Sequence, residues 1–515
     1  MAIEHGRRRT IIVIGIMMAA LLQTLDSTIV NVALPTIEGN IGASIDDGTW
    51  IITGYIISNV IAIPLAPFLL QRLGRRQYFV MSIAGFTIAS VLCGTATTLP
   101  LLVFYRVVQG AFGGGLIATS QIILRDTLPP EKIGSSSALF AVALTVGPAL
   151  GPTLGGWLTD NLSWPWVFEI NLVPGAIAAF IMLTMLRNPA EPKKLAFDWA
   201  GIGFLAIGLG SLQYVLDEGE RHDWFGDGSI VTVALASVAG LAAFACWELF
   251  GTRRPIVDLR VFRYRNVAVG AATAILLGMV MFGPTVMLPQ YTQGILGFTP
   301  TMSGMLMLVR AIPVVLLTPF VARLAGRIDT RIIIVTGCIV NAVSFALLGL
   351  RMTTQSDFGT LAVVVGISGV GQALVFVPLL VAVIGSVGGT DGPKASSFIS
   401  LSFQLGASIA STMLVTVFDR RTFFHSDVFR ASVNANSPFW QHVAYGPDAL
   451  ATLARIAQQQ ATNAGFADAI WALVPLALAA IVLALALRRP PRVAGPATVP
   501  APVVTKREAL VALRR

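Results

Sequence analysis

The sequence predicts an all-α polytopic membrane protein with about fourteen membrane-spanning helices. Hydrophobic residues make up 55% of the 515 residues and charged residues only 12%, whereas a soluble domain carries roughly 25% charged residues. The mean hydropathy is +0.77. The charges are bunched between apolar runs, each of which can cross a hydrocarbon core about 30 Å thick. No large soluble domain fits in the remainder.

Breaks that are charged or rich in Gly and Pro separate the apolar runs and so define the expected spans. The segment at residues 5–9 is basic and leads directly into the first run without a small-residue cleavage site, so we expect a retained helix rather than a signal peptide. The expected spans are residues 11–33, 49–70, 78–97, 100–124, 134–158, 166–187, 197–216, 228–250, 267–291, 299–325, 331–351, 357–386, 394–418 and 464–487.

The basic residues predict the orientation of the chain. Lys and Arg are retained on the cytoplasmic side of short loops. With a cytoplasmic N-terminus, most of the 35 Lys and Arg residues fall on that side, and the bias persists to the tail. This supports an even number of spans and places both termini in the cytoplasm. The net charge of +9 follows from this topology and does not indicate nucleic-acid binding.

Two segments lie outside the expected spans. Residues 419–463 are the one long outer loop, and their mixture of aromatic, polar and apolar residues predicts a short amphipathic helix on the membrane or on a partner. The tail from Arg488 is rich in Pro, Ala and Arg and cannot bury a core, so we expect it to be disordered.

Two ionisable residues stand at membrane depth in the first half. Asp26 lies in the middle of the first span and Arg106 in the fourth. A carboxylate at this depth must be protonated, paired or exposed to a water-filled cavity, and an acid that switches between these states can couple to proton flow. A guanidinium stays charged and needs an acidic or carbonyl partner. We expect both residues in a proton pathway; the alternative is a permanent structural pair.

Glycines form a regular pattern in the fifth span. Gly147, Gly151 and Gly155 recur every four residues, with Pro152 and Gly156 beside them. Such a face lets another helix backbone approach closely, and proline loosens the helix. A small-residue face alone means tight packing, but the repeated Gly-Pro that ends in Gly-Gly is rarer and is the most specific signal in the chain.

Three further features are candidates for function. A short basic inner loop follows the second span, where it is either a topology determinant or a gate that closes against helix ends. Glu169 near the outer end of the sixth span is a possible second proton site, and Arg310 inside the tenth could bind or repel substrate charge. The loop residues concerned are Arg72, Gly74, Arg75 and Arg76.

Nothing in the sequence resembles the active site of an enzyme. It contains no phosphate-binding Gly-Lys-Ser/Thr loop. Its four histidines lack zinc spacing, and its three cysteines lie in apolar runs with no metal or disulfide pattern. We therefore expect no catalytic residues, no cofactor and no metal site.

At these motifs the sequence resembles the major facilitator superfamily, and within it the fourteen-span drug:proton antiporters of the EmrB/QacA type, closest to the EmrB-like branch. The resemblance covers nearly the whole chain. It is carried by residues 25–35, by residues 106–115, which resemble the proton-relay motif, by residues 147–156, which resemble the antiporter motif, and by residues 164–171, 212–219, 223–225 and 289–293.

The resemblance implies two six-helix bundles related by a pseudo-two-fold axis, with a substrate site between them. Residues 1–190 would form the first bundle, 191–265 two extra linking helices, 266–487 the second bundle with the outer loop, and 488–515 the cytoplasmic tail. Gln109, Gln290, Gln293 and Arg310 are candidates for the cavity wall.

The sequence departs from the family pattern at four positions. Pro67 and Gln71 replace a Gly and an Asp of the inner-loop motif, which puts the latching role of that Asp in doubt. Pro165 stands where an Arg is common, and Arg310 where an uncharged residue is usual. The last two changes could alter the preference for substrate charge.

The resemblance implies a proton-coupled antiporter that exports amphipathic drugs or toxic small molecules across the bacterial inner membrane. A periplasmic adaptor and an outer-membrane channel are possible partners besides substrate, protons and lipid. Two alternatives stay open: a dedicated exporter of one native metabolite, lipid or siderophore, and a non-transporting membrane sensor or scaffold.

Overall fold

The computed structural model describes residues 6–43, 45–128, 130–188, 197–252, 255–387, 391–432 and 447–488. Helices dominate these residues, and no strand occurs among them. A helix satisfies its own backbone hydrogen bonds, as a chain in lipid requires. Thirteen stretches of described residues are long and apolar enough to cross a membrane. The fifth expected span lies within one further helix of 32 residues, Pro130–Asn161, so the prediction of about fourteen spans is consistent with the structure.

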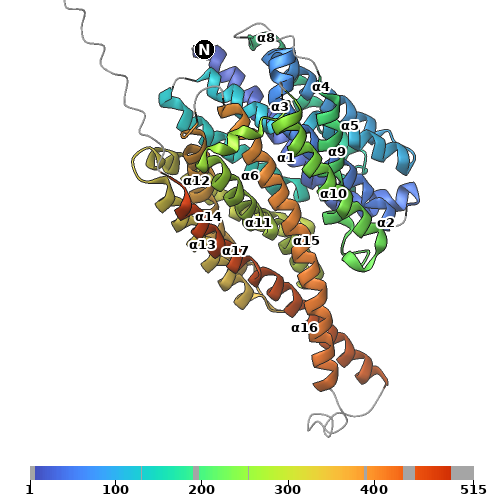
Figure 1. The fold of residues 1–515 in the computed structure, drawn as a ribbon. Coiled ribbons are helices and arrows are strands. Elements are labelled where there is room, and N and C mark those ends of the chain that lie inside the picture. The colour runs from blue at the N-terminus through green and yellow to red at the C-terminus, as the bar shows by residue number, and fades with distance from the viewer. Residues whose placement is uncertain are drawn as a thin grey trace, which may run out of the picture.

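The first half of the chain forms one helical bundle (Figure 1). A tight turn at Gly74 joins two of its helices with φ 86° and ψ 150°, a conformation that is essentially restricted to glycine. The sixth span is broken around Asn171. The helices of this half are α1 (Gly6–Ile41), α2 (Ile45–Gly48), α3 (Trp50–Leu73), α4 (Arg75–Gly94), α5 (Leu99–Thr127), α6 (Pro130–Asn161), α7 (Trp166–Glu169) and α8 (Leu172–Met185).

The second half forms a matching bundle. The pairs α1–α6, α3–α5, α4–α5 and α4–α8 pack in the first half, and α11–α15, α12–α14, α13–α14 and α13–α17 are the equivalent pairs in the second. This repetition confirms the two-bundle architecture. The helices are α11 (Arg265–Gly294), α12 (Pro300–Ala325), α13 (Thr330–Arg351), α14 (Phe358–Ile384), α15 (Gly392–Ser432), α16 (Pro447–Trp471) and α17 (Leu473–Ala486).

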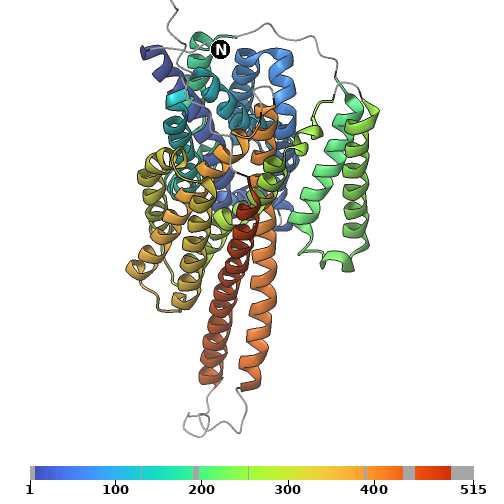
Figure 2. The same ribbon diagram turned by 60° about the vertical axis from the view of Figure 1, so that its left-hand side comes forward.

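Two extra helices link the bundles and stand at the edge of the molecule (Figure 2). They are α9 (Trp199–Glu218) and α10 (Gly228–Cys246), with the short turns η1 (Trp224–Gly226), η2 (Trp247–Gly251) and η3 (Leu259–Arg263) around them. α9 packs against both α3 and α15. The linking pair therefore touches both halves.

The segment expected as a long outer loop is mostly helical. α15 continues to Ser432 and α16 begins at Pro447, so the two form a hairpin that projects from the bundle (Figure 2). The 41 residues of α15 span about 60 Å at 1.5 Å per residue, about twice the hydrocarbon core. The mixed composition of residues 419–463 concealed this because helices packed on each other outside lipid need no continuous apolar run. Residues 433–446 and the tail beyond Arg488 lie outside the described residues.

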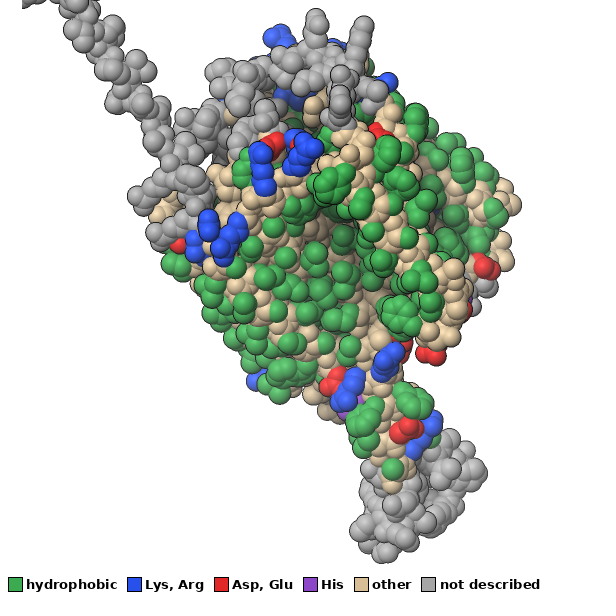
Figure 3. Space-filling view, in the orientation of Figure 1, with side chains coloured by type: hydrophobic (Ala, Val, Ile, Leu, Met, Phe, Trp, Pro, Cys, Tyr) green, Lys and Arg blue, Asp and Glu red, His purple; other side chains and the backbone are tan. Residues whose placement is uncertain are grey.

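The two ends of the molecule differ. We call the end where α1 begins the near end, and the end from which the α15–α16 hairpin projects the far end. Hydrophobic side chains cover the middle of the face in Figure 3, and charged side chains gather toward the two ends. This distribution is what a bundle crossing a membrane requires.

Candidate functional site

A large cavity lies between the two bundles. Its volume is about 1050 Å³, and its walls come from α1, α3, α5, α6 and α9 on one side and α11, α12, α14 and α15 on the other. At the far end its lining reaches the exposed residue Asp419 on α15. Toward the near end it stops at Gln121 and Ile399. The structure is therefore open toward the far end.

The floor of the cavity is closed by contacts between the halves. Ser396 on α15 donates a hydrogen bond to the side-chain oxygen of Gln121 on α5 at 2.6 Å. Side chains from α3 of the first half and from η3 and α15 also share one hydrophobic cluster, which includes Ile63, Val261 and Phe398. The two halves are thus in contact on this side of the cavity.

Asp26 and Arg106 form a buried ion pair in the first half. The Arg106 Nη1 donates to Asp26 Oδ2 at 2.7 Å, and the two side chains are 1% and 0% exposed. The Arg106 Nε donates to the carbonyl of Ile51 at 3.1 Å, and the guanidinium lies 4.1 Å from the ring centre of Tyr55. The structure brings together two residues that are 80 positions apart in the sequence.

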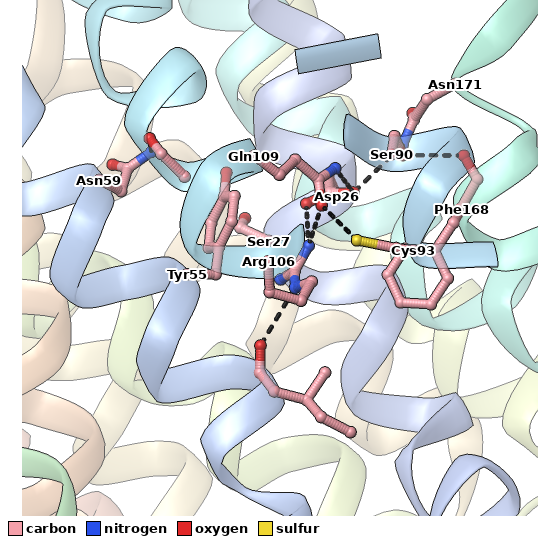
Figure 4. A network of polar contacts seen from close by, with 12 residues as sticks. Asp26, Ser27, Tyr55, Asn59, Ser90, Cys93, Arg106, Gln109, Phe168 and Asn171 are labelled. Carbon is pink, nitrogen blue, oxygen red and sulfur yellow. Dashed lines mark hydrogen bonds and ion pairs between the residues drawn. The ribbon is translucent and has the colours of Figure 1, made fainter. Parts of the chain in front are cut away.

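Two amides complete the surroundings of the carboxylate (Figure 4). Gln109 Nε2 and Asn171 Nδ2 donate to Asp26 Oδ1 at 2.8 and 3.1 Å. Asn171 also donates to Ser90 Oγ at 3.0 Å, and Ser90 donates to the carbonyl of Phe168 at 2.9 Å. Four hydrogen-bonded side chains thus link Asp26 to its surroundings, so protonation of this one carboxylate would disturb contacts that reach five helices.

The position of Gln109 differs from the expectation that it lines the cavity. It is fully buried, and it bridges Asp26 and Arg106, accepting from Arg106 Nη1 at 2.8 Å. It lies three residues after Arg106 on α5, and residues at this spacing share a helix face. The amide therefore belongs to the ion-pair network, while Arg106 and Tyr55 form the boundary between that network and the cavity.

Glu169 contributes no atom to the network around Asp26 among the described residues. It lies against Gly94 of α4 and is partly exposed. Its neighbours Phe168 and Asn171 face the interior, and one residue along a helical turn changes the direction of a side chain by about 100°. Its role as a second proton site stays a prediction.

The glycine face of α6 packs directly on α1. A methyl group at Gly147 or Gly151 would come within 2.1 Å of the hydroxyl oxygen of Thr24 or Thr28, and one at Gly155 within 2.6 Å of the Ile29 carbonyl oxygen. Gly156 is buried, and Pro152 lines the cavity. The glycines thus hold the backbone of the helix that carries Asp26 against α6.

The basic inner loop contacts its own half and the linker. Arg75 donates to the carbonyl of Arg187 at 2.9 Å, and the backbone N–H of Arg76 donates to Asn188 at 2.8 Å. Arg72 lies 4.0 Å from the ring centre of Phe197. These contacts tie α3 and α4 to the end of α8 and to the start of the linking pair.

Gln290, Gln293 and Arg310 all line the cavity from the second half. Arg310 is 5% exposed and donates to the Met281 carbonyl at 2.7 Å and to Thr285 Oγ1 at 3.2 Å.

The network around Asp26 contains three residues for which no role was predicted from the sequence: Asn171, Ser90 and Tyr55. A polar side chain inside an apolar span is the signal that could have found them.

The comparisons with known proteins agree with this architecture. The sequence profile of the Major Facilitator Superfamily matches residues 16–411. The chain belongs to the major facilitator superfamily. As a member it is a multi-pass membrane transporter of small molecules and not an enzyme.

Two curated members of this superfamily show which branch it resembles. The chain is 35% identical to the multidrug export protein EmrB of Escherichia coli K12, over 84% of this chain and 85% of that protein. It is 35% identical to the fatty acid resistance protein FarB of Neisseria gonorrhoeae, over 82% and 83% of the two chains. Among solved structures, the proton:xylose symporter XylE matches with a TM-score of 0.60 at 13% identity, over 92% of this chain and 94% of that one.

Proposed function

We propose that this transporter exports amphipathic small molecules in exchange for protons. The observation that supports this most directly is the Asp26–Arg106 pair, since it places a carboxylate that can bind a proton beside the wall of a cavity that can hold a substrate. Multidrug export by the EmrB relative points the same way.

The proposed cycle alternates between two openings of the cavity. In the far-open state Asp26 is paired and surrounded by donors. A proton that enters from the far end would neutralise the carboxylate and release Arg106, and loss of the proton toward the near end would restore the pair. One proton entering down 100 mV supplies about 2.3 kcal/mol, which sustains a roughly fifty-fold substrate gradient.

We propose that the near end faces the cytoplasm and that the protein lies in the bacterial inner membrane. Arg residues of the described inner loops gather at the near end, at Arg75, Arg265 and Arg327 among others, and such residues are retained in the cytoplasm. The cavity then opens to the periplasm, as required for release of an exported substrate.

We further propose that the α15–α16 hairpin docks to a periplasmic adaptor that leads to an outer-membrane channel. The hairpin extends beyond the bilayer thickness and exposes apolar side chains there, with Phe423 and Phe424 69% and 51% exposed. Replacing both with Asp should abolish co-purification of an adaptor and drug resistance in cells, while transport in vesicles persists. Equal co-purification with the unmodified protein would contradict this role.

Everted membrane vesicles test the export function. A ΔpH is established by respiration, and lipophilic cations, anions and neutral antibiotics are added singly to vesicles that carry the wild type, Asp26→Asn or the matched control Asp160→Asn, which changes an exposed carboxylate at the end of α6. We expect a transported compound to collapse the ΔpH with the wild type and the control but not with Asp26→Asn. An equal response of Asp26→Asn would place coupling elsewhere, and no response to any compound would favour a dedicated substrate.

A further inference from the structure

Arg310 is a buried cation without a carboxylate partner in the part of the chain that the structure describes. Its side chain is 5% exposed, and two of its donors reach the neutral acceptors Met281 O and Thr285 Oγ1 on α11. Its Nε has no hydrogen-bond partner. A guanidinium remains protonated at any physiological pH, and burying a charge without a counter-charge costs several kcal/mol. Such a group in a transport cavity indicates an anionic ligand.

Arg310 differs from the other two basic residues of the cavity wall, because each of those lies beside a carboxylate. The lining contains Arg106, Arg221 and Arg310. Arg106 is neutralised by Asp26 at 2.7 Å, and Arg221 lies 3.7 Å from Glu218. Among the described residues Arg310 forms no ion pair. The deep part of the cavity therefore carries one uncompensated positive charge, and it comes from the second half.

Apolar side chains line the cavity that contains Arg310. Phe282 and Val286 on α11, Met307 and Val314 on α12, and Phe376 on α14 all belong to the same cavity lining. A ligand with an acidic head and an apolar body would satisfy both kinds of surface. A lipophilic cation would bury its charge beside the guanidinium, and such like-charge contact is unfavourable.

The far-end rim carries the opposite sign. Asp217 and Glu220 at the end of α9 and Asp419 on α15 line the cavity toward the opening, beside the Glu218–Arg221 ion pair. These carboxylates repel an anion that approaches from the far side. The order of charges, positive deep and mainly negative at the rim, thus disfavours rebinding from the far side.

We propose that Arg310 binds the acidic group of an amphipathic anion whose apolar body lies against Phe282, Val286 and Phe376. The proposal rests on the proposed export function and names the substrate class of its cavity. Gln290 and Gln293, which line the same cavity nearer the C-terminal end of α11, supply neutral donors along the route to the far end.

Equilibrium binding tests the site without any proton gradient. The purified full-length protein is titrated at pH 8 with the fluorescent probe 11-(dansylamino)undecanoate and with its uncharged methyl ester. Because hydrogen bonds to a charged group are stronger than those between neutral groups, the wild type should bind the acid at least about tenfold more tightly than the ester.

The variants separate charge recognition from folding. Arg310→Gln should lose the preference for the acid and keep the affinity for the ester, and Arg310→Lys should keep part of the preference. Arg323→Gln is the matched control, because Arg323 lies on the same helix but is not part of the cavity lining. Retained ester binding shows that a variant is folded.

Two results would overturn the proposal: equal binding of acid and ester by the wild type, or an unchanged acid preference in Arg310→Gln. If Arg310→Gln does not bind the ester, the variant is not folded. The proposal is then tested by the acid preference of Arg310→Lys and by the ratio of acid to ester affinity in the wild type. An acid preference without any substrate-driven proton movement in vesicles would contradict the export function and leave the anion site intact. Substrate-driven proton movement in vesicles without an acid preference in binding would contradict the anion site and leave the export function supported.

Discussion

Ser396 donates a hydrogen bond to Gln121 across the boundary between the two bundles, at 2.6 Å and over 275 residues of sequence. The bond lies at the cavity floor, where α15 of the second half meets α5 of the first. In the proposed cycle the two halves separate at this point when the cavity opens toward the near end. The proposal therefore predicts that the contact forms and breaks once in each cycle.

Cross-linking this contact should stop transport. In a Cys246→Ala background, which removes the one exposed cysteine among the described residues, Gln121→Cys and Ser396→Cys are joined by a short bis-methanethiosulfonate reagent. We expect transport in vesicles to fall at least tenfold, because the far-open state is trapped, and to return on reduction.

A cross-link within one half serves as the control for the first prediction. Ser344 donates to the Val364 carbonyl at 2.8 Å between α13 and α14, and these helices move together as one bundle. Linking Ser344→Cys to Val364→Cys should leave transport unchanged. Transport that survives the Gln121–Ser396 link would show that this floor does not open.

Removing the Asn171 amide should slow transport. Asn171→Ala deletes one donor to the Asp26 carboxylate, and a hydrogen bond to a charged group is worth about 1.5–3 kcal/mol. We expect roughly tenfold slower substrate-driven proton movement in everted vesicles, because the Asp26 carboxylate loses its link through Asn171 to Ser90 on α4. Asn161→Ala is the control, since that exposed amide contacts only its own helix. Equal rates of both variants would remove Asn171 from the pathway.

The glycine face of α6 should tolerate no side chain at Gly155. A methyl group there meets the Ile29 carbonyl oxygen at 2.6 Å, and overpacking of this kind costs about 1–3 kcal/mol. We expect Gly155→Ala to lower the midpoint of thermal unfolding in detergent and to reduce transport. Gly203→Ala on α9 meets nothing within 4 Å, so it should be neutral or slightly stabilising.

The nature of the obstacle distinguishes two of these glycines. At Gly151 the nearest atom is the side-chain hydroxyl of Thr28, whereas at Gly155 it is backbone. Thr28→Ala should therefore recover much of the stability lost in Gly151→Ala and none of that lost in Gly155→Ala. If Thr28→Ala restored the stability of both variants equally, α1 and α6 would be shifting apart as whole helices.

The start of α15 should be less stable in acid. Asp391 at the start of α15 accepts from Lys394 at 2.9 Å, and this hydrogen bond together with the Lys394 charge holds the Asp391 pKa below its usual value of 3.8. A lowered pKa means that the folded state favours the carboxylate. The stabilisation is thus fully present above about pH 4 and is lost as the pH falls further.

Thermal unfolding of the purified protein between pH 3 and pH 7 measures this effect. The difference in midpoint between the wild type and Asp391→Asn should be constant above pH 5 and should shrink toward pH 3. In a Lys394→Gln background the Asp391→Asn change should have a smaller effect, because the principal partner is gone. A difference that is independent of pH would assign Asp391 a role other than this ion pair.

The sequence by itself determined the membrane class, most span positions, and the residues that are costly at membrane depth. Charge is so expensive in lipid that Asp26, Arg106 and Arg310 stand out without any structure. The spacing of Gly147, Gly151 and Gly155 likewise predicted a packing face, because helix periodicity places residues four apart on one side. These are local properties of one helix.

Only the tertiary structure decided which side chains meet. Helix periodicity fixes the face a residue occupies but not the helix that packs against it. Gln109 therefore turned out to contact Asp26 instead of the cavity, and Asn171 joined the same carboxylate from a break in the sixth span. The α15–α16 hairpin was missed for a related reason: its helices stabilise each other outside lipid, so hydropathy does not mark them. The neutral hydrogen-bond partners of Arg310 on α11 were equally a matter of packing between helices.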